Sequence, residues 1–130
     1  MLIVLDTNVI VSAVLTPAGR PAWLLSQVIA GRLQLCYDFR IAEEYREVLL
    51  RPKFNLQPDF VEFLLHQILT DGIDVVAPPL AHDFIDESDK KFFEVAKYCQ
   101  APLVTGNRKH FPEDPLIRSV ADFCNSVMPA

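Results

Sequence analysis

The chain has 130 residues, of which 51% are hydrophobic and 22% charged, and its net charge at pH 7 is −5. This length fits one domain, which we expect to span residues 1–130, and it suffices to bury a hydrophobic core. The negative net charge argues against a protein that coats nucleic acid through a broad basic surface. It does not exclude an enzyme that acts on nucleic acid, because an acidic metal site adds negative charge of its own.

The chain shows no sign of a membrane or secretory protein. Its first hydrophobic stretch, 2–15, is interrupted by Asp6 and Asn8 and has neither a basic leader nor a small-residue cleavage site. Its cysteines, three in all, are widely spaced in apolar surroundings, which is typical of reduced core residues and not of a disulfide framework or a metal cage. We therefore expect a cytoplasmic protein with no membrane partner.

Hydrophobic patterns and turn residues divide the chain into short strands that alternate with helices. The expected strands are 2–5, 33–37, 73–76 and 103–105. The expected helices are 8–15, 21–30, 39–50, 58–71 and 87–100, and the tail from residue 116 adds an edge strand and a last short helix. This alternation predicts an α/β fold with a mostly parallel central sheet of four to five strands and helices on both faces.

Polar side chains follow two of these strands directly. Asp6, Thr7 and Asn8 follow the first strand, and Thr105 and Asn107 stand at and after the end of the fourth. Because the loops at the carboxyl ends of parallel strands meet in one crevice, we expect these residues to lie close together. Hydrogen bonds that hold Asp6 and the crevice backbone are the favoured role of Thr7 and Asn8. Contact with substrate is a further prediction for Thr7, Asn8 and Thr105.

Helical periodicity selects the other acids that reach this crevice. Glu44 lies at the edge of the apolar stripe on the helix after the second strand, whereas Glu43 points away from that stripe. Asp89 lies at the core edge of the helix after the third strand, and Asp86 lies one turn earlier on the same side. We therefore expect Asp6, Glu44 and Asp89 to form the cluster, with Asp86 as a further candidate.

Several carboxylates in one crevice need a neutralising cation. Two like unit charges about 4 Å apart repel by about 4 kcal/mol at an intermediate dielectric constant. Oxygen ligands without a neighbouring histidine or cysteine favour Mg²⁺ or Mn²⁺ over zinc. Such ions activate water and stabilise in-line attack at phosphorus, so the cluster predicts metal-dependent cleavage of a phosphodiester backbone. Local cations at Lys90, Lys91, Arg108 and Lys109 are the candidates for contact with phosphate.

Four segments follow one another along the chain: LDTNV (5–9), RIAEEYREVLLRPKF (40–54), DESDKKF (86–92) and VTGNRKHFP (104–112). In this order and spacing they resemble the PIN domain family, over nearly the whole chain. In these segments the chain resembles the VapC-like bacterial toxins, which are often paired with an antitoxin. The resemblance implies a metal-dependent ribonuclease that cleaves single-stranded RNA, a small antitoxin protein as partner, and a homodimer.

The resemblance also assigns roles to residues. It implies Asp6, Glu44 and Asp89 as the catalytic acids, and Asp86 matches a frequent further acid of the family. The family usually has aspartate after Thr-Gly, where this chain has Asn107. An amide oxygen can bind a metal ion or its water with less charge, which bears on metal affinity and rate. The predicted metal ligands are Asp6, Glu44, Asp86, Asp89 and Asn107.

Simpler roles remain open for several of these residues. Asp6 and Asp86 could each cap the helix that follows, and Asp89 could be a surface charge. His110 fits contact with phosphate or plain exposure better than the role of general base. Two other classes of phosphate chemistry, aspartyl-phosphate phosphatases and receiver domains, also place an acid after the first strand, but their motifs fit poorly. A PIN scaffold that binds RNA or protein without cleaving it is the alternative function.

A hydrophobic stripe in the predicted fourth helix can have either of two structural roles. The stripe, Phe60, Phe63 and Leu64, is either part of the core or a dimer face, and a platform for base stacking is disfavoured.

Overall fold

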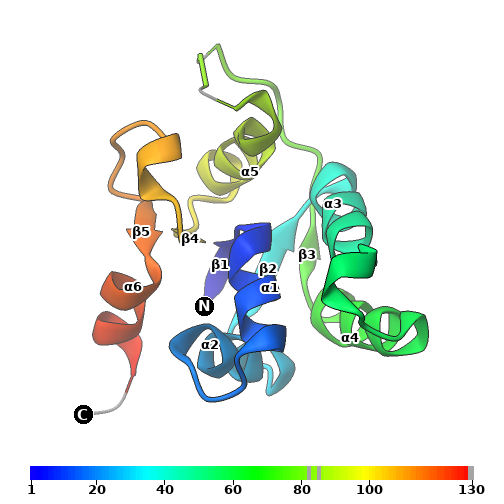
Figure 1. The fold of residues 1–130 in the computed structure, drawn as a ribbon. Helices are drawn as coiled ribbons and strands as arrows, with labels where there is room; N and C mark the ends of the chain where they lie inside the picture. Colours follow the sequence, from blue (N-terminus) through cyan, green and yellow to red (C-terminus); the bar gives the residue numbers. More distant parts are fainter. Residues whose placement is uncertain (82, 85, 129–130) are drawn as a thin grey trace.

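The computed structural model describes residues 1–81, 83–84 and 86–128 (Figure 1). The strands of this part of the chain are β1 (Leu2–Leu5), β2 (Gln34–Tyr37), β3 (Ile73–Asp74), β4 (Leu103–Thr105) and β5 (Ile117–Ser119). The helices are α1 (Thr7–Leu15), α2 (Arg20–Ile29), α3 (Phe39–Leu49), α4 (Pro58–Thr70), α5 (Lys90–Cys99) and α6 (Val120–Val127). Short 3₁₀ turns are η1 (Pro52–Phe54), η2 (Glu87–Asp89) and η3 (Arg108–His110).

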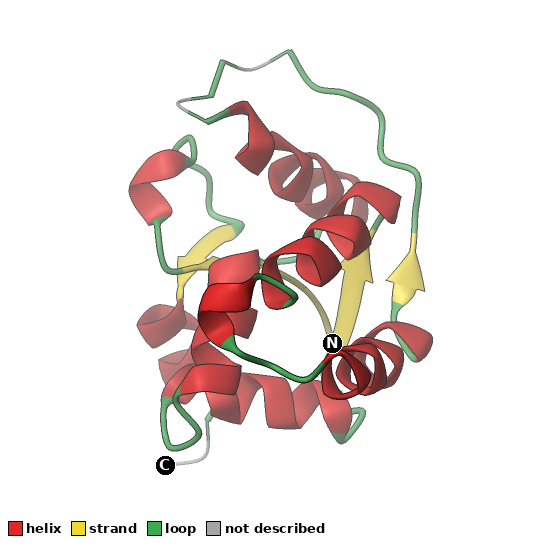
Figure 2. Ribbon diagram, turned by 45° about the vertical axis from the view of Figure 1, so that its right-hand side comes forward, coloured by secondary structure: helices red, strands yellow, loops and turns green. Residues whose placement is uncertain are grey.

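The five strands form one sheet in the order β3-β2-β1-β4-β5, and every pairing is parallel. Figure 2 shows helices packed around the middle of the sheet, and with the parallel strands it confirms the predicted α/β architecture. The chain leaves β1 toward β2 on one side and reaches β4 on the other side. The carboxyl end of β1 is therefore the point at which the strand order reverses, which is where open α/β sheets form their binding crevice.

Two predicted elements differ from those observed by more than one residue at an end. The third strand ends at Asp74, two residues earlier than expected, although the amide of Val75 still donates a hydrogen bond of 2.9 Å to the carbonyl oxygen of Tyr37. β3 is an edge strand that pairs with β2 alone, and both of its residues are exposed. Few buried contacts therefore stabilise a longer strand. The helix expected at 87–100 begins as the turn η2 and becomes α-helical at Lys90.

Tyr45 connects the core to the crevice. Its side chain is fully buried, and its hydroxyl donates a hydrogen bond of 2.5 Å to the carbonyl oxygen of Leu5. Asp38 begins the same helix, where its carboxylate accepts a hydrogen bond of 3.1 Å from the amide of Ile41, as the sequence predicted. The Asp38 bond caps α3, while the Tyr45 bond fixes α3 against the end of β1 and thereby places Glu44 beside Asp6.

The predictions about the cysteines and the hydrophobic stripe are met in part. The described cysteines are free; Cys36 and Cys124 are buried and Cys99 is half-buried. Leu64 belongs to the core, but Phe60 and Phe63 are 44% and 63% exposed, so the core reading of that stripe is wrong for both phenylalanines. No single helix in the described ranges is long and apolar enough to cross a membrane; α1 and α2, bent by 101°, pass that test only as a joined pair.

Candidate active site

Asp6 lies at the carboxyl end of β1, with 5% of the residue exposed. It occupies the N-cap position of α1, yet its side chain makes no capping hydrogen bond. One carboxylate oxygen instead accepts a hydrogen bond of 2.7 Å from the hydroxyl of Thr105, at the end of β4. Asp6 is therefore joined to the neighbouring strand and does not cap the helix that it precedes.

Hydrogen bonds also hold the loop after β4. The amide of Asn107 donates to the hydroxyl of Thr105 at 2.9 Å, and the amide of Gly106 donates to Oδ1 of Asn8 at 3.3 Å. Asn8 therefore holds the crevice backbone, as the sequence predicted. Thr105 connects Asn107 to Asp6, a role that the sequence did not assign to it. The residue Asn107 itself is exposed.

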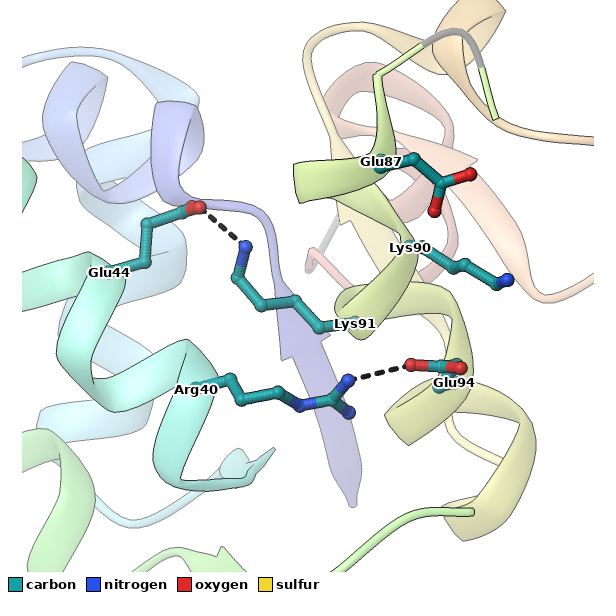
Figure 3. A pocket seen from close by; sticks show the side chains of 6 residues that line it. All are labelled: Arg40, Glu44, Glu87, Lys90, Lys91 and Glu94. Carbon is teal, nitrogen blue, oxygen red and sulfur yellow. Dashed lines mark hydrogen bonds and ion pairs between the residues drawn. The ribbon is translucent and has the colours of Figure 1, made fainter. Parts of the chain in front are cut away.

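Glu44 projects from α3 with 24% of its side chain exposed. The hydroxyl of Thr7 donates a hydrogen bond to its Oε2, and the ammonium of Lys91 lies 2.7 Å from its Oε1 (Figure 3). The adjacent Glu43 is exposed and forms an ion pair with Arg46, at 3.2 Å on the same helix. The choice of Glu44 over Glu43 as the residue that faces the crevice is therefore confirmed.

Asp89 stands in the last position of η2, with 18% of its side chain exposed, so a plain surface charge does not describe it. Its Oδ2 lies 3.5 Å from Nδ1 of His110, whose side chain is 44% exposed. Burial raises the pKa of Asp89, and the charges of Asp86 and Glu44 raise it further, while His110 opposes them. His110 thus lies within the electrostatic field of the acids.

The electrostatics of Asp6 show that acids from three separate segments share one crevice. Burial raises the pKa of Asp6 from 3.8 to about 6, and the charges of Asp89 and Glu44 add to this increase. The hydrogen bond from Thr105 acts in the opposite direction. A site that resists holding its own negative charge is suited to a cation.

The same acids do not yet form a coordination shell. Among the described residues, no three aspartate, glutamate, histidine or cysteine side chains converge closely enough to hold a metal ion. Each acid faces its own partner: Thr105 for Asp6, Thr7 and Lys91 for Glu44, and His110 for Asp89. The donor set fits a hard divalent cation by its chemistry, since all its groups are carboxylates. To bind one ion together, these side chains must turn toward a common point.

Asp86 has the geometry of a helix cap. Its Oδ1 accepts hydrogen bonds from the amide and the hydroxyl of Ser88, at 2.9 and 2.7 Å. These bonds lower the pKa of this exposed carboxylate. The capping role that the sequence left open is thus observed, and the role of Asp86 as a metal ligand remains a prediction.

The candidate phosphate contacts line two hollows. A hollow of about 450 Å³ beside Glu44 is lined by Arg40, Glu44, Glu87, Lys90, Lys91 and Glu94 (Figure 3). A second hollow, of about 890 Å³, includes Arg108 and Lys109. Nη1 of Arg108 lies 3.2 Å from a carboxylate oxygen of Asp122, so part of its charge is compensated.

A buried ion network beside the first hollow was not predicted from the sequence. Glu94 is 3% exposed and accepts hydrogen bonds from Nη1 of Arg40, at 2.8 Å, and from the amide of Leu80, at 2.7 Å. Arg40 also lies 2.6 Å from Asp38. The sequence does contain a sign of this network, because Glu94 lies within the apolar run 92–96. A carboxylate buried in such a run requires a charged or hydrogen-bonding partner.

The family assignment follows from comparison with known proteins. A family model described as PIN domain matches residues 2–109. The chain is 29% identical, over 110 residues, to the uncharacterized protein MJ1680 of Methanocaldococcus jannaschii, covering 82% of this chain and 70% of that protein. No solved structure matches the chain. The matched range includes Asp6, Glu44, Asp89 and Asn107, and with the parallel sheet it shows that this chain belongs to the PIN domain family.

Proposed function

We propose that this protein is an endoribonuclease that cleaves single-stranded RNA at a Mg²⁺ or Mn²⁺ site held by Asp6, Glu44 and Asp89. Membership of the PIN domain family supports a nuclease-type function and the use of a divalent metal. The observation that carries the proposal is the position of Asp6, which lies buried at the carboxyl end of β1, joined to Thr105 at 2.7 Å and within the electrostatic field of Asp89 and Glu44. Acids that repel one another at a strand-order reversal are suited to phosphodiester hydrolysis once a cation binds.

The residues around these acids have distinct tasks in this proposal. A bound divalent cation supplies charge neutralisation and lowers the pKa of a water molecule. Thr105 and Thr7 hold Asp6 and Glu44 by hydrogen bonds, so that these carboxylates keep their positions in the crevice. Lys90, Arg108 and Lys109 line the two flanking hollows and offer positive charge to RNA phosphates. Asp86 and Asn107 are further candidate ligands.

The experiment is cleavage of matched single-stranded RNA, double-stranded RNA and single-stranded DNA by the metal-free protein, with Mn²⁺, Mg²⁺ or excess EDTA added. Cleavage of single-stranded RNA that requires the metal and is lost in Asp6→Asn supports the proposal. Undiminished cleavage in EDTA contradicts the metal mechanism. Binding without cleavage of any nucleic acid selects the alternative function, a PIN scaffold that acts as a binding module.

The partners belong to the same proposal. The segments shared with VapC-like toxins support a small antitoxin protein that inhibits the enzyme, and a homodimer as the functional unit. Expression of the chain alone should then arrest growth of the host, and the Asp6→Asn variant should not. Equal growth of both cultures, despite RNA cleavage by the purified protein, contradicts the toxin role and leaves the nuclease proposal intact.

A further inference from the structure

The Lys91 side chain lies almost buried beside the candidate acids, with 13% of it exposed. Its Nζ lies 2.7 Å from Oε1 of Glu44, and it also donates a hydrogen bond to the carbonyl oxygen of Ser88. The same group lies 5.1 Å from the centroid of the Phe92 ring. Figure 3 shows Lys91 extending from α5 toward Glu44 on α3. The carboxylate, the carbonyl and the ring together hold this ammonium in one place.

Both carboxylate oxygens of Glu44 are occupied by donors of the protein. Lys91 is paired with Oε1, and the hydroxyl of Thr7 donates to Oε2. Any cation that takes Glu44 as a ligand must therefore lie close to at least one of these donors. Thr7 is neutral and can remain near a bound cation, whereas the ammonium of Lys91 repels it.

Lys90 provides a comparison within the same helical turn. It lines the same hollow as Lys91 and Glu44, and it carries the same charge. In the described part of the chain, Lys91 has an ion pair with Glu44, while no ion pair is found for Lys90. A difference in metal affinity between variants of the two lysines therefore arises from the contact with Glu44 and not from the total charge of the protein.

We propose that Lys91 is an internal counter-ion, which neutralises Glu44 in the metal-free protein and competes with the divalent cation for this carboxylate. Lys91 thereby sets the metal concentration at which the site becomes loaded. The inference rests on the proposed function, because it takes Glu44 as a metal ligand. Lys91 is a positioning residue in this account, since it acts through Glu44.

Charge interactions determine whether loss of Lys91 raises or lowers the metal affinity and the melting temperature. Removing Lys91 frees an oxygen of Glu44 and removes a positive charge near the cation, so metal binding should become tighter. In the metal-free protein the same change leaves Glu44 uncompensated beside Asp6 and Asp89, so the melting temperature should fall. Relaxation and solvent screening reduce the effect of one unit charge, and we expect about a tenfold tightening of the Mn²⁺ affinity.

The experiment compares wild type, Lys91→Met and the matched control Lys90→Met. Met keeps a long side chain on the same helical turn, and both variants lose one positive charge. Mn²⁺ affinity is measured by calorimetry on the metal-free proteins without RNA, and melting curves are recorded in chelator. Lys91→Met should bind Mn²⁺ about tenfold more tightly than Lys90→Met and should melt at a lower temperature without metal. Lys91→Arg retains the charge and should restore the affinity of wild type.

The outcomes separate this inference from the proposed function. Equal Mn²⁺ affinity in both Met variants, or weaker binding in Lys91→Met, overturns the role of Lys91 and leaves the metal site in place. Binding of Mn²⁺ by none of the proteins overturns the metal site, and with it the proposed function and the competition. If Lys91→Met does not fold, Lys91→Gln serves in the same comparison.

Discussion

The hydroxyl of Thr105 donates a hydrogen bond of 2.7 Å to the carboxylate of Asp6, and thereby joins the ends of β4 and β1. The same oxygen accepts a hydrogen bond from the amide of Asn107. One side chain thus orients a buried acid and the loop that follows the neighbouring strand.

Thr105→Val should test this connection, because it keeps the shape of the side chain and removes the hydroxyl. The buried carboxylate loses a donor, and we expect a loss of about 1–3 kcal/mol in the free energy of unfolding. The pKa of Asp6 should rise further, because this hydrogen bond lowers it. The measurement is denaturant unfolding in chelator. Thr105→Ser retains the hydroxyl and should behave as wild type; equal stability of the Val and Ser variants would refute the connection.

Asp6 should make the metal-free protein less stable as pH rises. Its pKa is about 6 in the folded protein and 3.8 for the ordinary group, so the folded state binds this proton more tightly. The stabilisation is present below pH 3.8 and is lost as pH rises through about 6. Asp6→Asn lacks this loss, so its stability relative to wild type should increase across that window, by up to about 3 kcal/mol. Unfolding of both proteins in chelator, at a series of pH values, measures the difference.

With Mn²⁺ present above pH 6, wild type should be more stable than Asp6→Asn, the reverse of the order expected without metal. A ligand stabilises the folded state in proportion to its affinity, and Asp6→Asn should bind the metal less well. Melting curves with and without Mn²⁺ give the comparison. If Mn²⁺ shifts both proteins equally and Asp6→Asn is destabilised without metal, Asp6 has a structural role only.

Asn107→Asp should lower the Mn²⁺ concentration that gives half-maximal RNA cleavage. An added anionic ligand strengthens the attraction to a hard dication. The amide of residue 107 bonds to Thr105 through the backbone, so the substitution leaves that contact intact. The measurement is a metal titration of initial rates, with Asn107→Ala as control. An unchanged or higher metal requirement places Asn107 outside the coordination sphere.

Binding of single-stranded RNA should depend only weakly on salt. Lys90, Arg108 and Lys109 offer few phosphate contacts, and three of them predict a slope of log K against log salt of about −2. Lys109→Met should reduce the magnitude of this slope by about 0.7. Titrations of the catalytically inactive Asp6→Asn protein with RNA measure both slopes. A slope that corresponds to about eight contacts would indicate a basic surface assembled by a dimer or a partner.

The predicted homodimer can be tested at α4. Phe63 is 63% exposed and helps to line an apolar groove between α4 and the segment that contains α1 and α2. If α4 is the dimer face, Phe63→Ser should weaken association about tenfold or more, because burial of an aromatic side chain dominates such contacts. Sedimentation at several protein concentrations gives the association constant. Tyr98→Ser changes an aromatic residue of α5 that is 56% exposed and serves as the control. An equal effect of both substitutions contradicts the assignment.

The sequence allowed most of the fold to be predicted, because the relevant signals are local. Periodicity distinguished Glu44 from Glu43, and proline and glycine residues marked the ends of most elements. Contacts between distant segments could not be predicted in this way. Two ion pairs, Lys91 with Glu44 and Arg40 with Glu94, join residues about fifty positions apart. A periodic pattern within one helix does not predict which residue of a distant helix becomes the partner.

The order of the strands has a consequence for synthesis of the protein. Of the five described strands, β1 is synthesised first, and it lies in the middle of the sheet, between β2 and β4. Until residues 103–105 are made, one edge of β1 has no partner, and Asp6 lacks a hydrogen bond that spans 99 positions of the chain. A nascent chain that ends before β4 therefore carries an open apolar edge, which is prone to aggregation. The acids Asp6, Glu44 and Asp89 are all present once residue 89 has been made, but Asp6 gains its hydrogen bond from Thr105 only after β4 has been synthesised.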